Sequence, residues 1–245
     1  MTMIKRIFLI LALLVVTAYL AFSVIWLATP PQGRLCKGVQ VVVVDSTEGG
    51  FVSVQGVREM IERLGECPLG KPLDSIRLYR IEQTLQKHPF IERAECYKSL
   101  SGYVCVDIHG RCPVMRVIDH LGSSYFIDKG GHIMPSGGGA AQLPVATGHI
   151  THEVATTVLY ELALLLQKDD FWGNQIEQVN VTAEGELELV PRVGNHLINL
   201  GKPRAVEHKL ERVKTFYEKV LNRVGWNRYA AINVEFDNQI ICTRR

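Results

Sequence analysis

Six cysteines have the widest chemical repertoire in this chain, and three of them lie close to a histidine in the sequence. That group of zinc-type ligands comprises Cys96, Cys105, His109 and Cys112, but its spacing lacks the paired C-x2-C grip of structural zinc sites. If residues 99–102 form a hairpin turn, Cys96 and Cys105 face each other across two strands, as a disulfide or as small buried apolar side chains. We favour the second interpretation and predict no metal site.

Two pairs of residues could act as an acid and a base, namely Asp119 with His120 and Asp128 with His132. Both pairs lie in turn-rich sequence, where solvated polar side chains are usual, and no activated nucleophile accompanies them. The chain also lacks the motifs G-x-S-x-G, G-x-x-x-x-G-K-S/T, H-E-x-x-H and G-x-G-x-x-G. We therefore predict a protein without catalytic residues or cofactors. An anchored hydrolase that uses His120 or His132 is the alternative.

The net charge argues against one large class of partners. The 245 residues include 27 Lys+Arg and 25 Asp+Glu, which gives a formal charge of +2. A protein that binds nucleic acid mainly through phosphates needs a clustered excess of basic residues. We therefore predict no nucleic-acid partner and look to proteins and membranes instead.

The segment 7–28 contains no charged residue and is long enough to cross the roughly 30 Å hydrocarbon layer as a helix. Lys5 and Arg6 precede it, so the positive-inside preference places the N-terminus in the cytoplasm. We predict a cytoplasmic tail at 1–6, a transmembrane helix at 7–28 and a linker at 29–37. A cleaved secretory signal and a buried core helix are the alternatives.

The region after the linker has a short alternation of strand and helix patterns. Its predicted elements are a strand at 39–44, a turn at 45–50, a helix capped by Ser53 and ended by Gly65, a helix from Asp74, and strands at 91–98 and 103–109. This order, β-α-α-β-β, is the one expected of a three-stranded sheet with two helices on one face.

The remaining sequence predicts a hairpin and two long helices. Residues 178–190 alternate around Glu184-Gly185 as a hairpin. The first helix has an apolar stripe that comprises Val154, Val158, Leu162 and Leu165. The second can start at Pro203, and its buried stripe comprises Val206, Leu210, Val213, Tyr217, Val220 and Val224.

The C-terminal segment predicts two more strands around a turn at Asp237-Asn238. The first has an apolar face made of Ile232, Val234 and Phe236. The second, at 239–243, has no later sequence to cover its outer side, so we expect an edge that accepts a partner's strand. Replacing Ile241 with proline should then remove one edge donor and leave the fold intact. An edge merely protected by Arg244-Arg245 is the alternative.

One short stretch resembles a known family. Residues 85–94 are similar to the helix-to-strand signature of POTRA domains, through Leu85, Pro89, Ile91 and Ala94. Proline ends the helix, Ile91 would point into the core, and Ala94 lets a helix approach. A POTRA domain directly after a single N-terminal span resembles the FtsQ/DivIB family of bacterial cell-division proteins.

Later segments are also similar to that family. Arg111-Cys112-Pro113-Val114 resembles the link into its second domain, although Gly110 stands where the family has an acidic residue. Residues 125–135 and 143–148 resemble its next strands, and 186–201 resembles its Bacteroidota-type branch. The resemblance implies an α+β fold with an N-terminal transmembrane helix, a POTRA domain at 38–110, and a mixed β-sheet domain with two long helices at 111–245.

The resemblance also implies a function. The expected role is a non-enzymatic, single-pass scaffold of the division machinery, with its bulk in the periplasm and its anchor in the inner membrane. The implied partners are FtsB/FtsL-like proteins at the C-terminal edge and the septal peptidoglycan synthesis machinery at the POTRA domain. The implied edge residues are Phe236, Asp237, Gln239, Ile240, Ile241, Cys242 and Thr243. A POTRA-type assembly or translocation factor for envelope proteins is the alternative.

Overall fold

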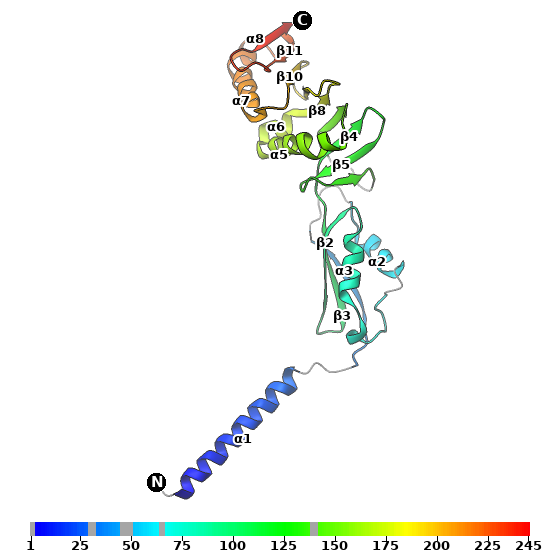
Figure 1. Ribbon diagram of the computed structural model, residues 1–245, viewed down its shortest axis with the longest axis vertical. Helices are drawn as coiled ribbons and strands as arrows, with labels where there is room; N and C mark the ends of the chain where they lie inside the picture. Colours follow the sequence, from blue (N-terminus) through cyan, green and yellow to red (C-terminus); the bar gives the residue numbers. More distant parts are fainter. Residues whose placement is uncertain (1–2, 29–32, 45–50, 64–66, 138–141) are drawn as a thin grey trace.

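The computed structural model describes residues 3–28, 33–44, 51–63, 67–137 and 142–245. The molecule is elongated, with helix α1 (Met3–Ala28) at one end (Figure 1). A three-stranded sheet with its helices follows, which we call the small unit, and a nine-stranded sheet with its helices lies at the other end, which we call the large unit. The predicted turn at 45–50 and the helix end at Gly65 lie outside the described residues.

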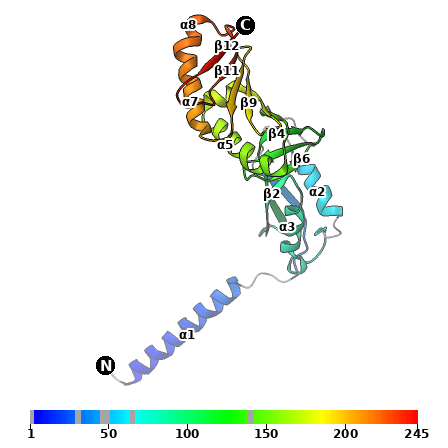
Figure 2. The same ribbon diagram turned by 45° about the horizontal axis from the view of Figure 1, so that its top comes forward.

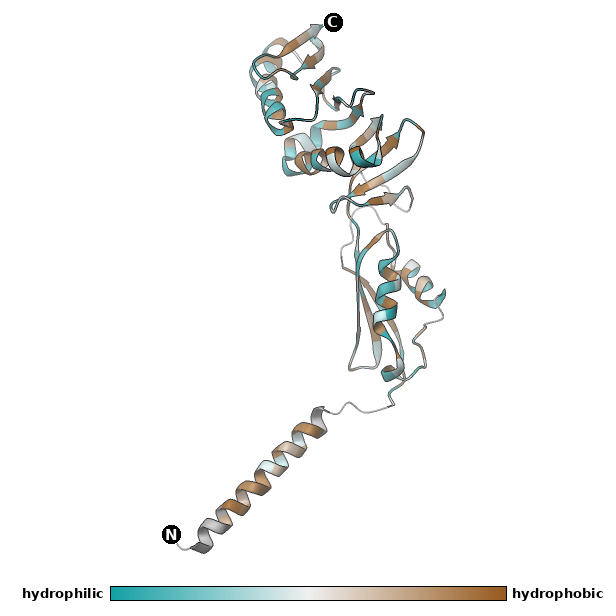
Figure 3. Ribbon diagram, viewed as in Figure 1, coloured by the Kyte–Doolittle hydropathy of each residue, from teal (hydrophilic) through white to brown (hydrophobic). Residues whose placement is uncertain are grey.

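Helix α1 extends away from both units (Figure 2). It is 26 residues long, and the part of it that Figure 3 colours is predominantly apolar. Its described side chains, at position 8 and at 10–25, are nearly all exposed; Phe8 is 74% and Tyr19 69% exposed. Within the part of the chain that is described, no helix is long and apolar enough to cross a membrane.

The small unit has the predicted order of elements. Its strands are β1 (Gly38–Val43), β2 (Ile91–Lys98) and β3 (Tyr103–Gly110), and its helices are α2 (Val54–Arg63), the 3-10 turn η1 (Leu73–Ser75) and α3 (Leu78–Gln86). The strand order is β1-β3-β2, with β1 parallel and β2 antiparallel to β3. The β-α-α-β-β prediction is therefore confirmed.

Local sequence signals explain how this unit folds. The Ser53 hydroxyl accepts a hydrogen bond from the Gly56 N–H at 3.0 Å, which caps α2 as predicted. Helix α3 ends shortly before Pro89, whose ring cannot continue a helix. The core then closes around fully buried residues that include Val57, Ile81, Leu85, Ile91 and Ala94. Cys36, predicted to lie in the linker, is also part of this core.

The expectation that Cys96 and Cys105 face each other is wrong. Cys96 lies opposite Val106, and Cys105 lies opposite Tyr97. Neighbouring residues in a strand place their side chains on opposite faces of the sheet. Cys105 is one position away from the residue opposite Cys96, so the two thiols lie on opposite faces. Both are free thiols, and burial, helped by Glu82 and Asp107, raises the pKa of Cys96 to about 12.

The large unit is one mixed sheet with helices packed on it. Its strand order is β12-β11-β10-β9-β8-β7-β4-β5-β6, and the pairs β4/β7, β7/β8 and β10/β11 are parallel. The strands are β4 (Pro113–Asp119), β5 (Ser124–Asp128), β6 (Ile133–Pro135), β7 (Val145–Gly148), β8 (Ile176–Val181), β9 (Leu187–Pro191), β10 (Leu197–Gly201), β11 (Tyr229–Asn233) and β12 (Ile241–Arg244). The predicted α+β class with a mixed sheet is confirmed.

Two long helical segments lie on the same side of this sheet (Figures 1 and 2). The first consists of α4 (His152–Val154), the π-helical turn η2 (Ala155–Leu159) and α5 (Tyr160–Lys168), and the short α6 (Asp170–Gln175) follows it. The second consists of α7 (Val206–Phe216), the π-helical turn η3 (Tyr217–Leu221) and α8 (Asn222–Val224).

The second long helix differs from its prediction at both ends. It begins at Val206 rather than Pro203, because Ala205 before it adopts a left-handed conformation with φ 50°. The π-helical turn inserts one extra residue and rotates the buried face. Leu221 is therefore fully buried, whereas Val224, predicted to be buried, is 47% exposed.

Candidate partner-binding edge of the large sheet

Strand β12 is the last strand in the order of the large sheet, and it pairs with β11 alone. It begins two residues later than the predicted strand at 239–243 and ends at Arg244. One side of this strand therefore has no neighbouring strand within the described part of the chain.

Side chains alternate between the two faces of this edge. Ile240 and Cys242 are half-buried against the core of the large unit. Ile241 and Thr243 are exposed, and Ile241 is 46% exposed although it is apolar. Burial raises the pKa of the Cys242 thiol, which keeps it protonated and apolar in character.

The hydrogen-bonding pattern shows which backbone groups point outward. Val234 donates its N–H to the carbonyl of Asn199 in β10 at 2.9 Å. The N–H and C=O groups of successive residues in a strand point to opposite sides. Because the Val234 N–H points toward β10, the N–H and C=O groups of Ala231 and Asn233 point toward β12. Their opposite residues, Ile241 and Thr243, then use both backbone groups in the β11–β12 ladder. Cys242 lies between them, and its N–H and C=O point away from the sheet.

Two expectations about this edge are therefore wrong. Ile241 does not carry the outward donor, because its N–H belongs to the internal ladder; the outward donor is that of Cys242. Phe236 does not share a face with Ile232 and Val234, because β11 ends at Asn233 and Phe236 lies in the loop that follows. Both Ile232 and Val234 are fully buried, whereas Phe236 is 49% exposed.

Arg212 of helix α7 holds the loop between β11 and β12 in place. Its Nη1 donates to the carbonyl of Val234 at 3.3 Å, and its Nη2 donates to the carbonyl of Gln239 at 2.7 Å. One guanidinium thus bonds to both ends of the loop that contains Phe236 and Asp237, which are exposed.

A groove of about 400 Å³ lies beside this loop, between the α7–η3 helix and Ile240. It is lined by His208, Glu211, Arg212, Thr215, Phe216, Lys219, Val220 and Ile240. Sequence reasoning missed both the groove and the role of Arg212. The relevant signal, an arginine on the half-exposed side of an amphipathic helix, is common on protein surfaces and points to no particular contact.

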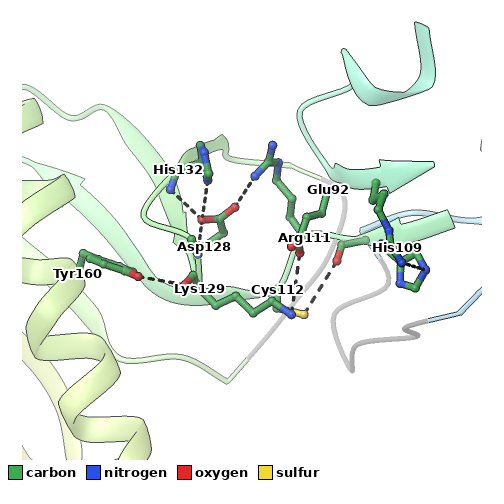
Figure 4. Close-up of polar contacts among 11 residues, drawn as sticks. Glu92, His109, Arg111, Cys112, Asp128, Lys129, His132 and Tyr160 are labelled. Carbon is green, nitrogen blue, oxygen red and sulfur yellow. Dashed lines mark hydrogen bonds and ion pairs between the residues drawn. The ribbon is translucent and has the colours of Figure 1, made fainter. Parts of the chain in front are cut away.

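The pairs considered for acid-base chemistry have structural contacts instead. The carboxylate of Asp119 accepts hydrogen bonds from the N–H groups of Leu121 and Ser123 in a turn. Asp128 is 2% exposed and forms an ion pair with Arg111 at 2.6 Å (Figure 4). His120 stacks on His149 with ring centroids 4.4 Å apart. Among the described residues, no three His, Cys, Asp or Glu side chains form a metal-binding group.

The fold and the edge together define a class of protein. The chain is an elongated α+β protein in which a small three-stranded unit precedes a large mixed sheet with an open edge strand. Residues 34–109 match the model of a POTRA-like domain, and residues 112–243 match the model described as FtsQ/DivIB, C-terminal related.

The chain belongs to the FtsQ/DivIB family. Over 203 residues it is 22% identical to a protein named Cell division protein FtsQ from Geotalea daltonii. That alignment covers 78% of this chain and 68% of the relative.

Proposed function

We propose that this protein is a membrane-anchored, non-enzymatic scaffold of bacterial cell division that binds a partner by adding the partner's strand to β12. Family membership and the relative's name support the division role. The observation that carries the binding mode is the outward direction of the Cys242 backbone groups at the end of the large sheet.

An added strand obtains affinity from main-chain hydrogen bonds and selectivity from pockets for its side chains. The Cys242 N–H and C=O can form the main-chain hydrogen bonds. The groove beside Ile240 lies on the helical side of the same edge and could receive a side chain or short helix of the partner. Exposed Phe236, in the loop before β12, and exposed Ile241, in β12 itself, offer further apolar surface at this edge.

The expected partners follow from the family. We propose that FtsB/FtsL-like proteins occupy the β12 edge, and that the small unit contacts the septal peptidoglycan synthesis machinery. If both the chain and its partners are anchored in the same membrane, they are confined to a thin layer, which raises their effective concentration. Weak contacts at β12 are then sufficient for assembly.

We propose that the anchor is the uncharged sequence segment 7–28, which falls within helix α1, although no helix within the described residues is by itself long and apolar enough to cross a membrane. A helix of 26 residues is about 39 Å long at 1.5 Å per residue, which exceeds the roughly 30 Å hydrocarbon layer. Residues 7–28 carry no charge, while Lys5 and Arg6 precede them. This arrangement supports the proposal of a cytoplasmic N-terminus with both units in the periplasm.

The edge is tested by a pair of substitutions at one position. Cys242→Pro removes the outward N–H, whereas Cys242→Ala keeps it and changes only the side chain. The tagged full chain is purified in detergent from its native host, and the co-purified FtsB-like protein is quantified. We expect the proline variant to lose the partner and the alanine variant to keep it. Equal recovery with both variants would contradict strand addition at β12.

Depletion of the protein separates the division role from its alternative. Filamentous cells without septa are expected for a division scaffold. Loss of outer-membrane proteins with normal septa would instead indicate a POTRA-type assembly factor. Purified full chain should also leave peptidoglycan intact; turnover abolished by replacing His120 or His132 would show that the protein is an enzyme.

The anchor has its own test. A reporter that is active only in the periplasm is fused after residue 245, and one that is active only in the cytoplasm is fused before residue 1. Both should be active in intact cells and should fractionate with the membrane. Release of the body as a soluble fragment without residues 1–28 would indicate a cleaved signal instead.

A further inference from the structure

A cavity of about 350 Å³ lies where the small unit meets the large one. The small unit contributes the end of α3 and the residues that follow it, and the large unit contributes the β5–β6 turn and the first turns of the α4–η2 helix. The polar side chains that line the cavity are Gln86, Lys87, His88, Arg111, His132, His152 and Thr156. None of the lining residues is acidic.

After ion pairs among the described residues are accounted for, the lining offers one unpaired cation and several hydrogen-bond donors to a ligand. Arg111 is paired with Asp128, so the pair carries no net charge, but only Nη1 of its guanidinium is used in that contact (Figure 4). Lys87 is exposed and forms no ion pair within the described part of the chain. Lys87 therefore supplies the fixed positive charge, and Arg111, the imidazoles and Thr156 supply hydrogen-bond donors.

His88 contributes a half-buried imidazole to the lining of the cavity. Its Nδ1 is buried and has no hydrogen-bond partner among the described residues. The ring lies against Phe90 with centroids 5.6 Å apart, and burial lowers the pKa of His88. Because Nδ1 has no accessible surface, an anion in the cavity would act on the ring through its charge rather than through a hydrogen bond to that atom.

The geometry points to a binding site for a small phosphate-type oxyanion at the junction of the two units, held by Lys87, Arg111 and the histidines around them. A phosphate has several strong acceptor oxygens in different directions, which suits donors that converge from two units. The cavity also has room for a group attached to the phosphate. A bound anion would contact both units at once and so stabilise their relative orientation.

The position of the cavity favours a soluble ligand over a lipid headgroup. Helix α1 lies at one end of the molecule, and the junction lies beyond the small unit (Figure 1). If α1 is in the membrane, the small unit separates the cavity from the bilayer. A free phosphate or a soluble phosphomonoester is therefore the expected source of the anion.

The test uses inorganic phosphate and the full chain in non-ionic detergent, with binding measured by isothermal titration calorimetry at constant ionic strength. The double variant Lys87→Gln, His152→Gln changes two exposed residues of the lining. The control Lys98→Gln changes an exposed lysine at the far end of β2. We expect saturable binding that the double variant weakens about tenfold and the control leaves unchanged.

A second readout reports on His88 itself. Bound phosphate should raise the pKa of His88, which a proton NMR titration detects through a signal that is absent in His88→Gln. Absence of saturable phosphate binding, or equal binding by the double variant, would overturn the site. Equal affinity for acetate would overturn the phosphate class, and binding only to vesicles that contain phosphatidic acid would overturn the soluble source.

Discussion

At the junction of the two units both oxygens of Asp128 accept hydrogen bonds inside the protein, whereas at β12 the backbone groups of Cys242 point out of it. Asp128 accepts from the Arg111 guanidinium and from the N–H groups of Gly130 and His132, at 2.6, 2.8 and 2.7 Å. Also between the two units, Phe51 packs on Phe90 and Phe126, with ring centroids 5.6 and 5.4 Å apart.

The two regions differ in what a substitution should disturb. A satisfied buried network stabilises the fold and the placement of the units, and it loses much when one member is removed. An open edge contributes little to its own fold and can bind another chain. Substitutions at the junction should therefore act on unfolding, and substitutions of outward groups at β12 should act on partner binding.

The largest effect is expected for Asp128→Ala. The substitution leaves a partly buried Arg111 without its counter-ion and two N–H groups without their acceptor, so the free energy of unfolding should fall by roughly 3 kcal/mol. Urea denaturation of the full chain in detergent measures it.

Asp119→Ala is the matched control for this prediction. Asp119 also accepts two backbone hydrogen bonds in a β-turn, but it has no cationic partner of this kind and is more exposed. Its replacement should destabilise the protein much less. Similar losses for the two variants would mean that the Arg111 ion pair contributes nothing beyond a turn contact.

The free energy of unfolding should also depend on pH through the ionisation of Asp128. Burial alone would raise the pKa of Asp128, but the hydrogen bonds from His132, Arg111 and Gly130 outweigh it and hold the pKa below its usual value. The ionised form is therefore favoured in the folded state, and its stabilisation is fully present above the unfolded pKa of about 3.9. It should be lost as the pH falls through the lower folded pKa. Urea denaturation between about pH 5 and pH 2 should show a steeper loss for the native chain than for Asp128→Asn.

Proline substitutions in β12 should have different effects, depending on whether the N–H that is lost points toward β11 or away from the sheet. Ile241→Pro removes a donor from the β11–β12 ladder and should lower the free energy of unfolding by roughly 2 kcal/mol. Cys242→Pro removes an outward donor, so its effect on unfolding should be smaller, although it should abolish partner capture. Urea denaturation of both variants measures the difference. A larger loss of stability for Cys242→Pro would reverse the assigned direction.

Features that depend on neighbouring residues were predictable from the sequence. The Ser53 cap, the helix end before Pro89 and the hairpin around Glu184-Gly185 all follow from local rules, and the structure contains them. Three residues of the POTRA signature, Leu85, Ile91 and Ala94, lie in the core at the predicted helix-to-strand transition, whereas Pro89 is exposed just beyond the end of the helix.

Features that depend on pairing between distant strands were not predictable. The faces of Cys96 and Cys105, and the direction of the Ile241 N–H, each reverse with a shift of one residue in register. Nothing in the sequence of a single strand fixes that register. The π-helical turn at 217–221 is a further case, because the 3.6-residue period used for the prediction does not include it.

The smallest effect on stability is expected for Arg212→Met, which keeps the apolar stem and removes the guanidinium donors. The carbonyls of Val234 and Gln239 lose a shared donor near the surface, where water can replace it, so the free energy of unfolding should fall by about 1 kcal/mol. The loop that presents Phe236 would then be held less firmly beside the groove. We expect recovery of the FtsB-like partner to fall more than stability does, and Lys219→Met, at another basic residue of the same groove, to affect both less. If Arg212→Met left partner recovery unchanged, the partner would contact the β12 ladder without using the loop.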